Sequence, residues 1–147
     1  MPKLQPQCFT EPCIGYVFDE ITSPRHKIVV LGDTYDPSPL IPLCEEPSPT
    51  LLIHEATDST ISPERDRNGK LSKRTIEVVM KTTLARGHST PVMAGEFARR
   101  VDAQALVLNH IGSRYLDNPS CLVFLLTLIL LKYCLWNLLQ IPGPVCD

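Results

Sequence analysis

The sequence predicts an α/β fold, because short apolar segments of strand type enclose two amphipathic helices. Segments rich in β-branched and aliphatic residues indicate buried strands. These segments are Lys27–Leu31 (KIVVL), Thr50–Ile53 (TLLI) and Ala105–Leu108 (ALVL). Both helical patterns fall between the second and the third segment. The order strand, strand, helix, helix, strand is typical of helices packed over a sheet.

The two helices are predicted from apolar residues at helical spacing. The first spans Leu71–Arg86 and ends at Gly87, since glycine commonly terminates helices. Its apolar face is predicted to hold Ile76, Val79, Met80 and Leu84. The second starts with Thr90 as N-cap and Pro91 in the first helical position. Its apolar side is predicted to hold Met93, Phe97 and Val101, opposite Glu96, Arg99 and Arg100.

Composition excludes a generally basic nucleic-acid-binding protein. The 147 residues carry a formal net charge of −2, and the pI is about 6.1. A local basic stretch lies between Glu64 and Arg86, where seven Lys and Arg residues stand against three acidic ones. Two interpretations stay open: a solvated helix and loop face, or a surface that contacts phosphates in a salt-dependent way.

Cysteines and prolines give weaker information. The six cysteines are scattered without a CxxC pair, which predicts reduced thiols rather than a disulfide framework or zinc ribbon. Residues 1–12 lack the apolar core of a signal peptide, so we expect an intracellular protein, in cytosol, nucleus or mitochondrion. The prolines between positions 37 and 49 predict an irregular loop after the first strand.

Polar side chains able to do chemistry follow each apolar segment. Asp33 follows the first, Glu55 the second and His110 the third, and His88 stands just before a predicted helix N-terminus. Ligands of α/β sheets bind at the carboxyl ends of strands, where successive loops converge. A helix N-terminus also suits anions. We therefore expect these four side chains to form one site.

Four ordered motifs resemble those of ribonuclease Z, the tRNA 3′-endonuclease branch of the metallo-β-lactamase fold, in its short form. The motifs are Gly32-Asp33-Thr34, Leu52–Thr57 (LIHEAT), Arg86–Thr90 (RGHST), and Leu108–Ile111 (LNHI) with Ser113-Arg114-Tyr115. The resemblance covers residues 15–115, including a strand at Gly15–Phe18, and corresponds to the C-terminal half of that family's domain. It implies half of an αββα sandwich.

The resemblance also implies roles. Asp33 would bridge two zinc ions and His110 would bind one of them. His88 would donate a proton to the leaving 3′ oxygen, and Glu55 would orient it. Substrate binding would involve Arg86, Ser89 and Thr90. The implied substrate is precursor tRNA, cut by zinc-activated water to leave a 3′ hydroxyl on the tRNA and a 5′ phosphate on the trailer.

The chain departs from the family pattern in its metal ligands. The family's HxHxDH motif is missing, and the only histidines are His26, His54, His88 and His110. Asp33 and His110 alone do not complete two zinc sites. We therefore expect weak or no zinc binding and no turnover unless a complementary N-terminal half is supplied. Without that half, an apolar sheet face would stay uncovered; persistence of the family's homodimer is open.

The sequence divides into an irregular N-terminus (1–14), the resembling domain (15–115) and an apolar tail (116–147) predicted to be helical. Cys121–Ile141 is long enough to cross a bilayer, although Lys132 near its middle opposes insertion. The tail is either an aberrant C-terminus or a membrane helix. The alternative function is accordingly a non-catalytic binding or membrane-associated protein. The HST motif disfavours a metallo-β-lactamase-fold hydrolase acting on another phosphodiester or ester.

Overall fold

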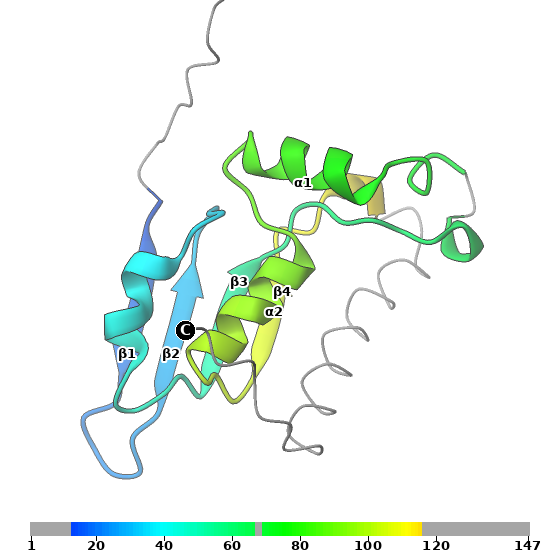
Figure 1. Cartoon of the computed structure of the whole chain (residues 1–147). Coiled ribbons are helices and arrows are strands. Elements are labelled where there is room, and N and C mark those ends of the chain that lie inside the picture. Colours follow the sequence, from blue (N-terminus) through cyan, green and yellow to red (C-terminus); the bar gives the residue numbers. More distant parts are fainter. Residues whose placement is uncertain (1–12, 67–68, 116–147) are drawn as a thin grey trace, which may run out of the picture.

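A computed structural model describes residues 13–66 and 69–115, and these residues form a four-stranded mixed sheet with helices. The strands are β1 (Gly15–Asp19), β2 (Lys27–Leu31), β3 (Leu51–Glu55) and β4 (Leu106–Asn109), in the order β1-β2-β3-β4. β1 is antiparallel to β2, whereas β2, β3 and β4 are parallel to one another (Figure 1). The predicted α/β class and strand positions are confirmed, with shifts of one or two residues at the ends of β3 and β4.

The first helix is shorter than predicted. α1 spans Ile76–Leu84 rather than starting at position 71. The Asp66 carboxylate accepts hydrogen bonds from the backbone N–H groups of Leu71 (2.7 Å) and Ser72 (2.8 Å), which holds this segment in a turn. Thr75 then caps the helix, its side chain accepting from the Val78 N–H at 3.3 Å.

The predicted apolar face of α1 is also wrong in part. Of the described helix, Val79 and Thr83 are the buried residues, whereas Ile76 is 68% exposed and Leu84 is exposed as well. The reason is the position of α1, which lies beyond the carboxyl ends of the strands rather than across the sheet (Figure 1). Only a narrow stripe of the helix therefore contacts the domain.

The second helix matches its prediction closely. α2 spans Pro91–Arg100, and the Thr90 side chain caps it by accepting from the Met93 N–H at 3.3 Å. Phe97 and Val101 are buried as predicted, while Met93 is half-buried. Glu96, Arg99 and Arg100 are exposed on the opposite side. α2 covers one face of the sheet (Figure 1). In the main core, Phe97 and Ala98 of α2 and the following Val101 lie with the strand residues Val29, Leu31 and Leu52.

The proline-rich loop is more regular than expected. Residues Ser38–Cys44 form a 3₁₀ helix, η1, with proline in its first turn, where the missing N–H is not needed. Two further 3₁₀ helices follow in the described residues, η2 (Pro63–Arg65) and η3 (Ser113–Tyr115). Cys44 at the end of η1 packs into the main core, which fixes the loop against the sheet.

The second face of the sheet exposes apolar side chains from three strands. Phe18 lies opposite Ile28, and Tyr16 lies opposite Val30, across the β1–β2 pair. Val107 of β4 shares this face because it pairs with Ile53, which pairs with Val30. The larger side chains here are exposed, Phe18 by 58%. The predicted uncovered apolar face is therefore present in the described part of the chain.

His54 lies in the core and is not part of the site. Its side chain is fully buried against Phe97, with ring centroids 6.0 Å apart, and its Nδ1–H donates to the Glu55 carbonyl at 2.8 Å. Nε2 has no hydrogen-bond partner. Burial lowers the pKa of His54, although the bond to the Glu55 carbonyl opposes this. The folded protein therefore holds this imidazole neutral.

Protonation of His54 should make stability fall in mild acid. Because the folded pKa lies below the unfolded value of 6.5, the unfolded chain binds more protons below that pH. We expect the free energy of unfolding to decrease as the pH falls below 6.5, by at most about 1.4 kcal/mol per pH unit from this group. Urea denaturation at several pH values should show a smaller slope for His54→Leu. The control His26→Leu, at an exposed histidine, should keep the original slope; equal slopes in all three proteins would refute the assignment.

The predicted apolar C-terminal helix (116–147) and most of the predicted irregular N-terminus lie outside the described residues. Within residues 13–66 and 69–115, no helix is long and apolar enough to span a membrane.

Candidate metal centre

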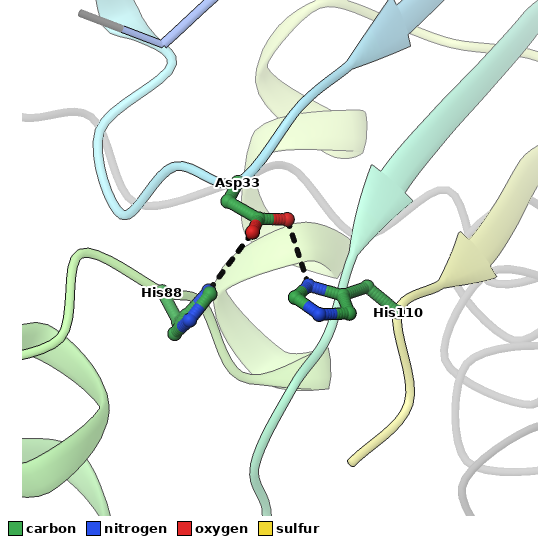
Figure 2. Close-up of side chains that lie close together, drawn as sticks. All are labelled: Asp33, His88 and His110. Atoms are coloured by element: carbon green, nitrogen blue, oxygen red, sulfur yellow. Dashed lines mark ion pairs between the residues drawn. The ribbon is translucent and has the colours of Figure 1, made fainter. Parts of the chain in front are cut away.

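The site residues converge at the carboxyl ends of the three parallel strands. Asp33 follows β2, Glu55 ends β3 and His110 follows β4. His88 comes from the turn between α1 and α2. Figure 2 shows the Asp33 carboxylate between the rings of His88 and His110. The structure thus brings together the four side chains that the sequence predicts to share a site.

Distances within this group are short. The Asp33 Oδ1 atom lies 2.7 Å from His110 Nδ1, and Asp33 Oδ2 lies 4.0 Å from His88 Nδ1. The two imidazole rings face each other edge-on, with centroids 5.2 Å apart. Asp33 and His110 are about half exposed, whereas His88 is 19% exposed. The group is therefore open to solvent on the side of Asp33 and His110.

The turn after α1 places His88. The Gly87 N–H donates to the Leu84 carbonyl and the His88 N–H donates to the Thr83 carbonyl, each at 3.0 Å, which is the Schellman pattern of helix ends. Gly87 has a φ of 76°, a conformation that glycine adopts at little cost. The helix ends at Leu84, two residues before its predicted end at Arg86, and Gly87 closes the turn that follows. The reversal turns the chain back, so that His88 points toward Asp33.

Glu55 is the buried anchor of the site, with 1% exposure. Its Oε2 accepts the backbone N–H (3.0 Å) and the hydroxyl (2.8 Å) of Thr57, and its Oε1 accepts the Ser89 N–H. Oε1 also lies 3.5 Å from His88 Nδ1. A buried carboxylate needs such partners because desolvation is otherwise costly. Glu55 therefore joins the end of β3 to the turn that carries His88.

The donors fit one metal ion. Asp33, His88 and His110 each offer one ligand atom, and these atoms lie within 4.8 Å of one another. A carboxylate and two imidazoles are ordinary zinc ligands, at metal–ligand distances of about 2.0–2.2 Å, so small side-chain movements would bring all three to one ion. The Nδ1 atom of His88 is buried without a hydrogen bond. Among the described residues this group supplies too few donors for two four-coordinate ions.

The residues predicted to bind substrate differ in accessibility. Ser89 is fully buried, and its hydroxyl donates to the Thr34 carbonyl at 2.6 Å. Thr90 is buried, with its hydroxyl capping α2. Both hydroxyls thus hold the local backbone in this structure. Arg86 is exposed beyond the end of α1. Contact of these three residues with a substrate stays a prediction.

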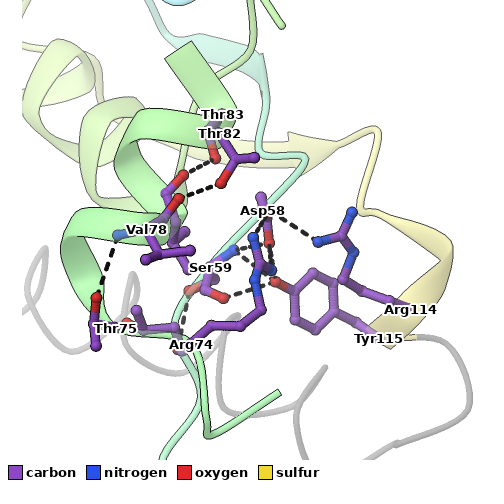
Figure 3. A network of polar contacts seen from close by, with 11 residues as sticks. Asp58, Ser59, Arg74, Thr75, Val78, Thr82, Thr83, Arg114 and Tyr115 are labelled. Carbon is purple, nitrogen blue, oxygen red and sulfur yellow. Dashed lines mark hydrogen bonds and ion pairs between the residues drawn. The ribbon is translucent and has the colours of Figure 1, made fainter. Parts of the chain in front are cut away.

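A buried polar cluster that the sequence did not predict supports the site. Asp58 accepts two hydrogen bonds from Arg74, at 2.7 and 2.6 Å, and one from Arg114 at 3.0 Å (Figure 3). The Tyr115 hydroxyl also donates to Asp58, and it accepts the Ser59 N–H at 2.7 Å. We name these residues the Asp58 clamp: Asp58, Ser59, Arg74, Arg114 and Tyr115. It ties the segments after β3 and β4 to the segment before α1.

The clamp is stable in its charged form. Burial opposes ionisation of Asp58, but the hydrogen bonds from Arg74 and Tyr115 and the charges of both arginines outweigh it and lower the pKa of Asp58. Burial, together with the hydrogen bond to Asp58, raises the pKa of Tyr115, so its hydroxyl stays protonated and available as a donor. Arg74, a member of the predicted basic stretch, is thus committed to the clamp. Arg67 of that stretch lies outside the described residues.

Comparison with known proteins finds sequence similarity to curated ribonucleases. No family model matches the chain. Ribonuclease Z of Natronomonas pharaonis is 34% identical over 97 residues, which cover 66% of this chain and 25% of the relative. Ribonuclease Z of Exiguobacterium sibiricum is 33% identical over 97 residues, which cover 66% of this chain and 26% of the relative. Ribonuclease BN of Proteus mirabilis is 31% identical over 88 residues, which cover 60% of this chain and 23% of the relative.

The similarity to ribonuclease Z that the motifs predict is therefore confirmed. This chain spans about a quarter of the length of the curated relatives it matches. Among solved structures, human tRNase Z, short form, is 28% identical with a TM-score of 0.42, covering 70% of this chain and 38% of that one. The metallo-β-lactamase fold protein YhfI from Bacillus subtilis is 20% identical with a TM-score of 0.39, covering 69% and 38%.

Proposed function

We propose that this chain supplies part of the active site of a zinc-dependent endoribonuclease that removes 3′ trailers from tRNA precursors. The observation that carries the proposal is the convergence of Asp33, Glu55, His88 and His110 at the carboxyl ends of three parallel strands. These four residues stand in the motifs that resemble ribonuclease Z, and the relatives of highest similarity reported above bear that name. An intracellular location goes with this proposal.

Each side chain has a role that its contacts support. Asp33 and His110 would hold zinc, which would supply an activated water and stabilise charge on the phosphate when bound. The Nδ1 atom of His88 faces the carboxylates of Glu55 (3.5 Å) and Asp33 (4.0 Å), so its proton is best placed on that nitrogen. A protonated His88 then presents Nε2–H as the proton donor. Glu55 fixes the ring because its own position is held by Thr57 and Ser89.

We propose further that the 147 residues alone do not form a complete active site. Asp33, His88 and His110 supply three donors, and His88 serves as the proton donor in this scheme. The apolar second face of the sheet, with Tyr16, Phe18, Ile28 and Val107, supports the further proposal that the domain is half of an αββα sandwich. The complementary half would cover this face and bring the remaining ligands. Burial of such a face is favourable by roughly 25 cal/mol per Å².

Two measurements test the proposal. One is zinc titration of the purified chain, and the other is an assay for cleavage of a tRNA precursor that carries a 3′ trailer. We expect at most one weakly bound zinc ion and no cleavage. Asp33→Ala should abolish the binding, because it removes the carboxylate shared by both imidazoles. The control Asp36→Ala, whose exposed carboxylate accepts from the Ser38 N–H and from the Ser38 side chain, should bind zinc like the parent.

Reconstitution with a complementary domain tests two proposals separately: the endonuclease role, and the incompleteness of the active site in this chain alone. Adding a domain that carries an HxHxDH motif should raise zinc content to two ions and restore cleavage at the 3′ end of the tRNA. Two zinc ions and cleavage by the chain alone would refute incompleteness. Failure to cleave after stable association with the added domain would refute the endonuclease role.

The second candidate is a non-catalytic binding protein that uses the same apolar face. The exposed Tyr16 and Phe18 side chains favour it, because contiguous apolar surface commonly marks an interaction site. This candidate predicts stable association without zinc uptake or cleavage, so the reconstitution experiment distinguishes it from the endonuclease.

A further inference from the structure

Thr57 lies between the buried carboxylate of Glu55 and the imidazole of His110. Its hydroxyl donates to Glu55 Oε2 at 2.8 Å and lies 3.3 Å from His110 Nδ1. Its backbone N–H reaches the Ser89 carbonyl at 3.1 Å, and its carbonyl accepts the Gly112 N–H at 3.1 Å. Thr57 therefore contacts the end of β3, the turn before α2 and the segment after β4 at once.

The proton of the Thr57 hydroxyl is already committed. A hydroxyl has one proton and two lone pairs, and Glu55 accepts that proton. Toward His110 the hydroxyl oxygen is therefore an acceptor, which requires the hydrogen of the imidazole on Nδ1. Asp33 Oδ1, at 2.7 Å from the same nitrogen, also requires it there. The Nε2 atom of a neutral His110 then keeps its lone pair.

We propose that Thr57 is a positioning residue that holds the His110 proton on Nδ1 and so leaves Nε2 free to bind a divalent cation. The inference rests on the proposed function, in which Asp33 and His110 are cation ligands. A cation bound to the Asp33 carboxylate would take that carboxylate away from His110 Nδ1. Among the described partners of this nitrogen, the Thr57 hydroxyl would then remain. A partner on the second nitrogen commonly fixes the tautomer of a metal-binding histidine.

The role can be measured without any cation. In Asp33→Ala, Thr57 becomes the remaining acceptor at Nδ1, as it would when a cation engages Asp33. Nitrogen NMR shifts of the His110 ring, recorded in the full chain at a pH where imidazoles are neutral, report the tautomer. We expect Nδ1–H to dominate in Asp33→Ala and in Asp33→Ala/Thr57→Ser. In Asp33→Ala/Thr57→Val, the hydroxyl is lost at nearly constant volume, and the proton should redistribute to Nε2.

The matched control is Asp33→Ala/Thr82→Val. It makes the same hydroxyl-to-methyl change on α1, where the Thr82 hydroxyl donates to the Val78 carbonyl, and it should retain the Nδ1–H form. Equal tautomer populations with and without the Thr57 hydroxyl would overturn the proposal, as would loss of the Nδ1–H form in Asp33→Ala alone.

A second readout links the tautomer to the ion. In the chain with Asp33 intact, Thr57→Val should weaken zinc affinity about tenfold or more, the usual effect of removing a partner of a ligating histidine, and Thr57→Ser should restore it. Absence of zinc binding by the parent chain is an outcome that the incomplete ligand set allows, and the tautomer would then decide the role of Thr57 by itself. Zinc affinity unchanged in Thr57→Val would overturn the inference while leaving the metal site in place.

Discussion

Asp58→Ala should lower the free energy of unfolding by about 3 kcal/mol, since removing one partner of a buried ion pair costs about 3–5 kcal/mol. The Asp58 side chain is only 6% exposed, and it accepts from Arg74, Arg114 and Tyr115. The lower end of the range applies because Arg74 and Arg114 are partly exposed and can regain water. Total stabilities of small domains are about 5–15 kcal/mol, so this loss is large.

Urea denaturation, monitored by circular dichroism, measures the change in the free energy of unfolding. The control is Arg25→Ala, which removes the guanidinium from an ion pair with Asp19 at 2.7 Å. That pair is at the surface, with side-chain exposures of 48% and 34%, so its loss should cost less than about 1 kcal/mol. Similar effects of the two substitutions would show that the Asp58 clamp contributes no more than a surface ion pair.

The clamp also illustrates what the sequence did not reveal. Asp58 lies 16 residues from Arg74 and 57 residues from Tyr115, so no local spacing connects them. Ser113-Arg114-Tyr115 belong to one of the sequence motifs, but the partner of Arg114 and Tyr115 becomes apparent only in the folded chain. Thr57 likewise stands within the LIHEAT motif, and its contact with His110 joins loops 53 residues apart.

The convergence of the site, in contrast, followed from the sequence. Each of the three apolar segments is followed by Asp33, Glu55 or His110, and parallel strands place their carboxyl ends on one edge of a sheet. Gly87 and Thr90 marked the turn that carries His88, because helix-terminating and helix-capping residues act locally. Local signals therefore located the site residues, while the contacts between them required the tertiary fold.

The prediction for α1 failed for a related reason. The spacing of Ile76, Met80 and Leu84 indicates an apolar face, yet Ile76 and Leu84 are exposed, because α1 lies beyond the carboxyl ends of the strands rather than across the sheet (Figure 1). Helical periodicity reports which residues share a face but does not say where that face lies. The start of α1 was set instead by Asp66, whose carboxylate holds the backbone of Leu71 and Ser72 outside the helix.

Gly112→Ala should destabilise the protein and weaken the site, because the segment after β4 passes very close to Thr57. A Cβ atom at position 112 would lie 2.5 Å from the Thr57 carbonyl oxygen, a backbone atom with little freedom to move. The same carbonyl accepts the Gly112 N–H at 3.1 Å, so relief of the clash would break this bond. We expect a loss of about 1–3 kcal/mol, as for other overpacked positions, and weaker zinc binding because His110 lies two residues away.

Gly95→Ala is the matched control, with an expected effect of opposite sign. Gly95 lies inside α2, and a Cβ atom there meets no atom within 4 Å. Alanine in place of a glycine within a helix stabilises by roughly 0.5–1 kcal/mol because the unfolded chain loses conformational freedom. Urea denaturation of the two variants should therefore shift the midpoint in opposite directions, and zinc titration should separate them further. A midpoint for Gly112→Ala at or above that of the parent would mean that the loop after β4 yields easily, and the fixed position of His110 beside Thr57 would then need another cause.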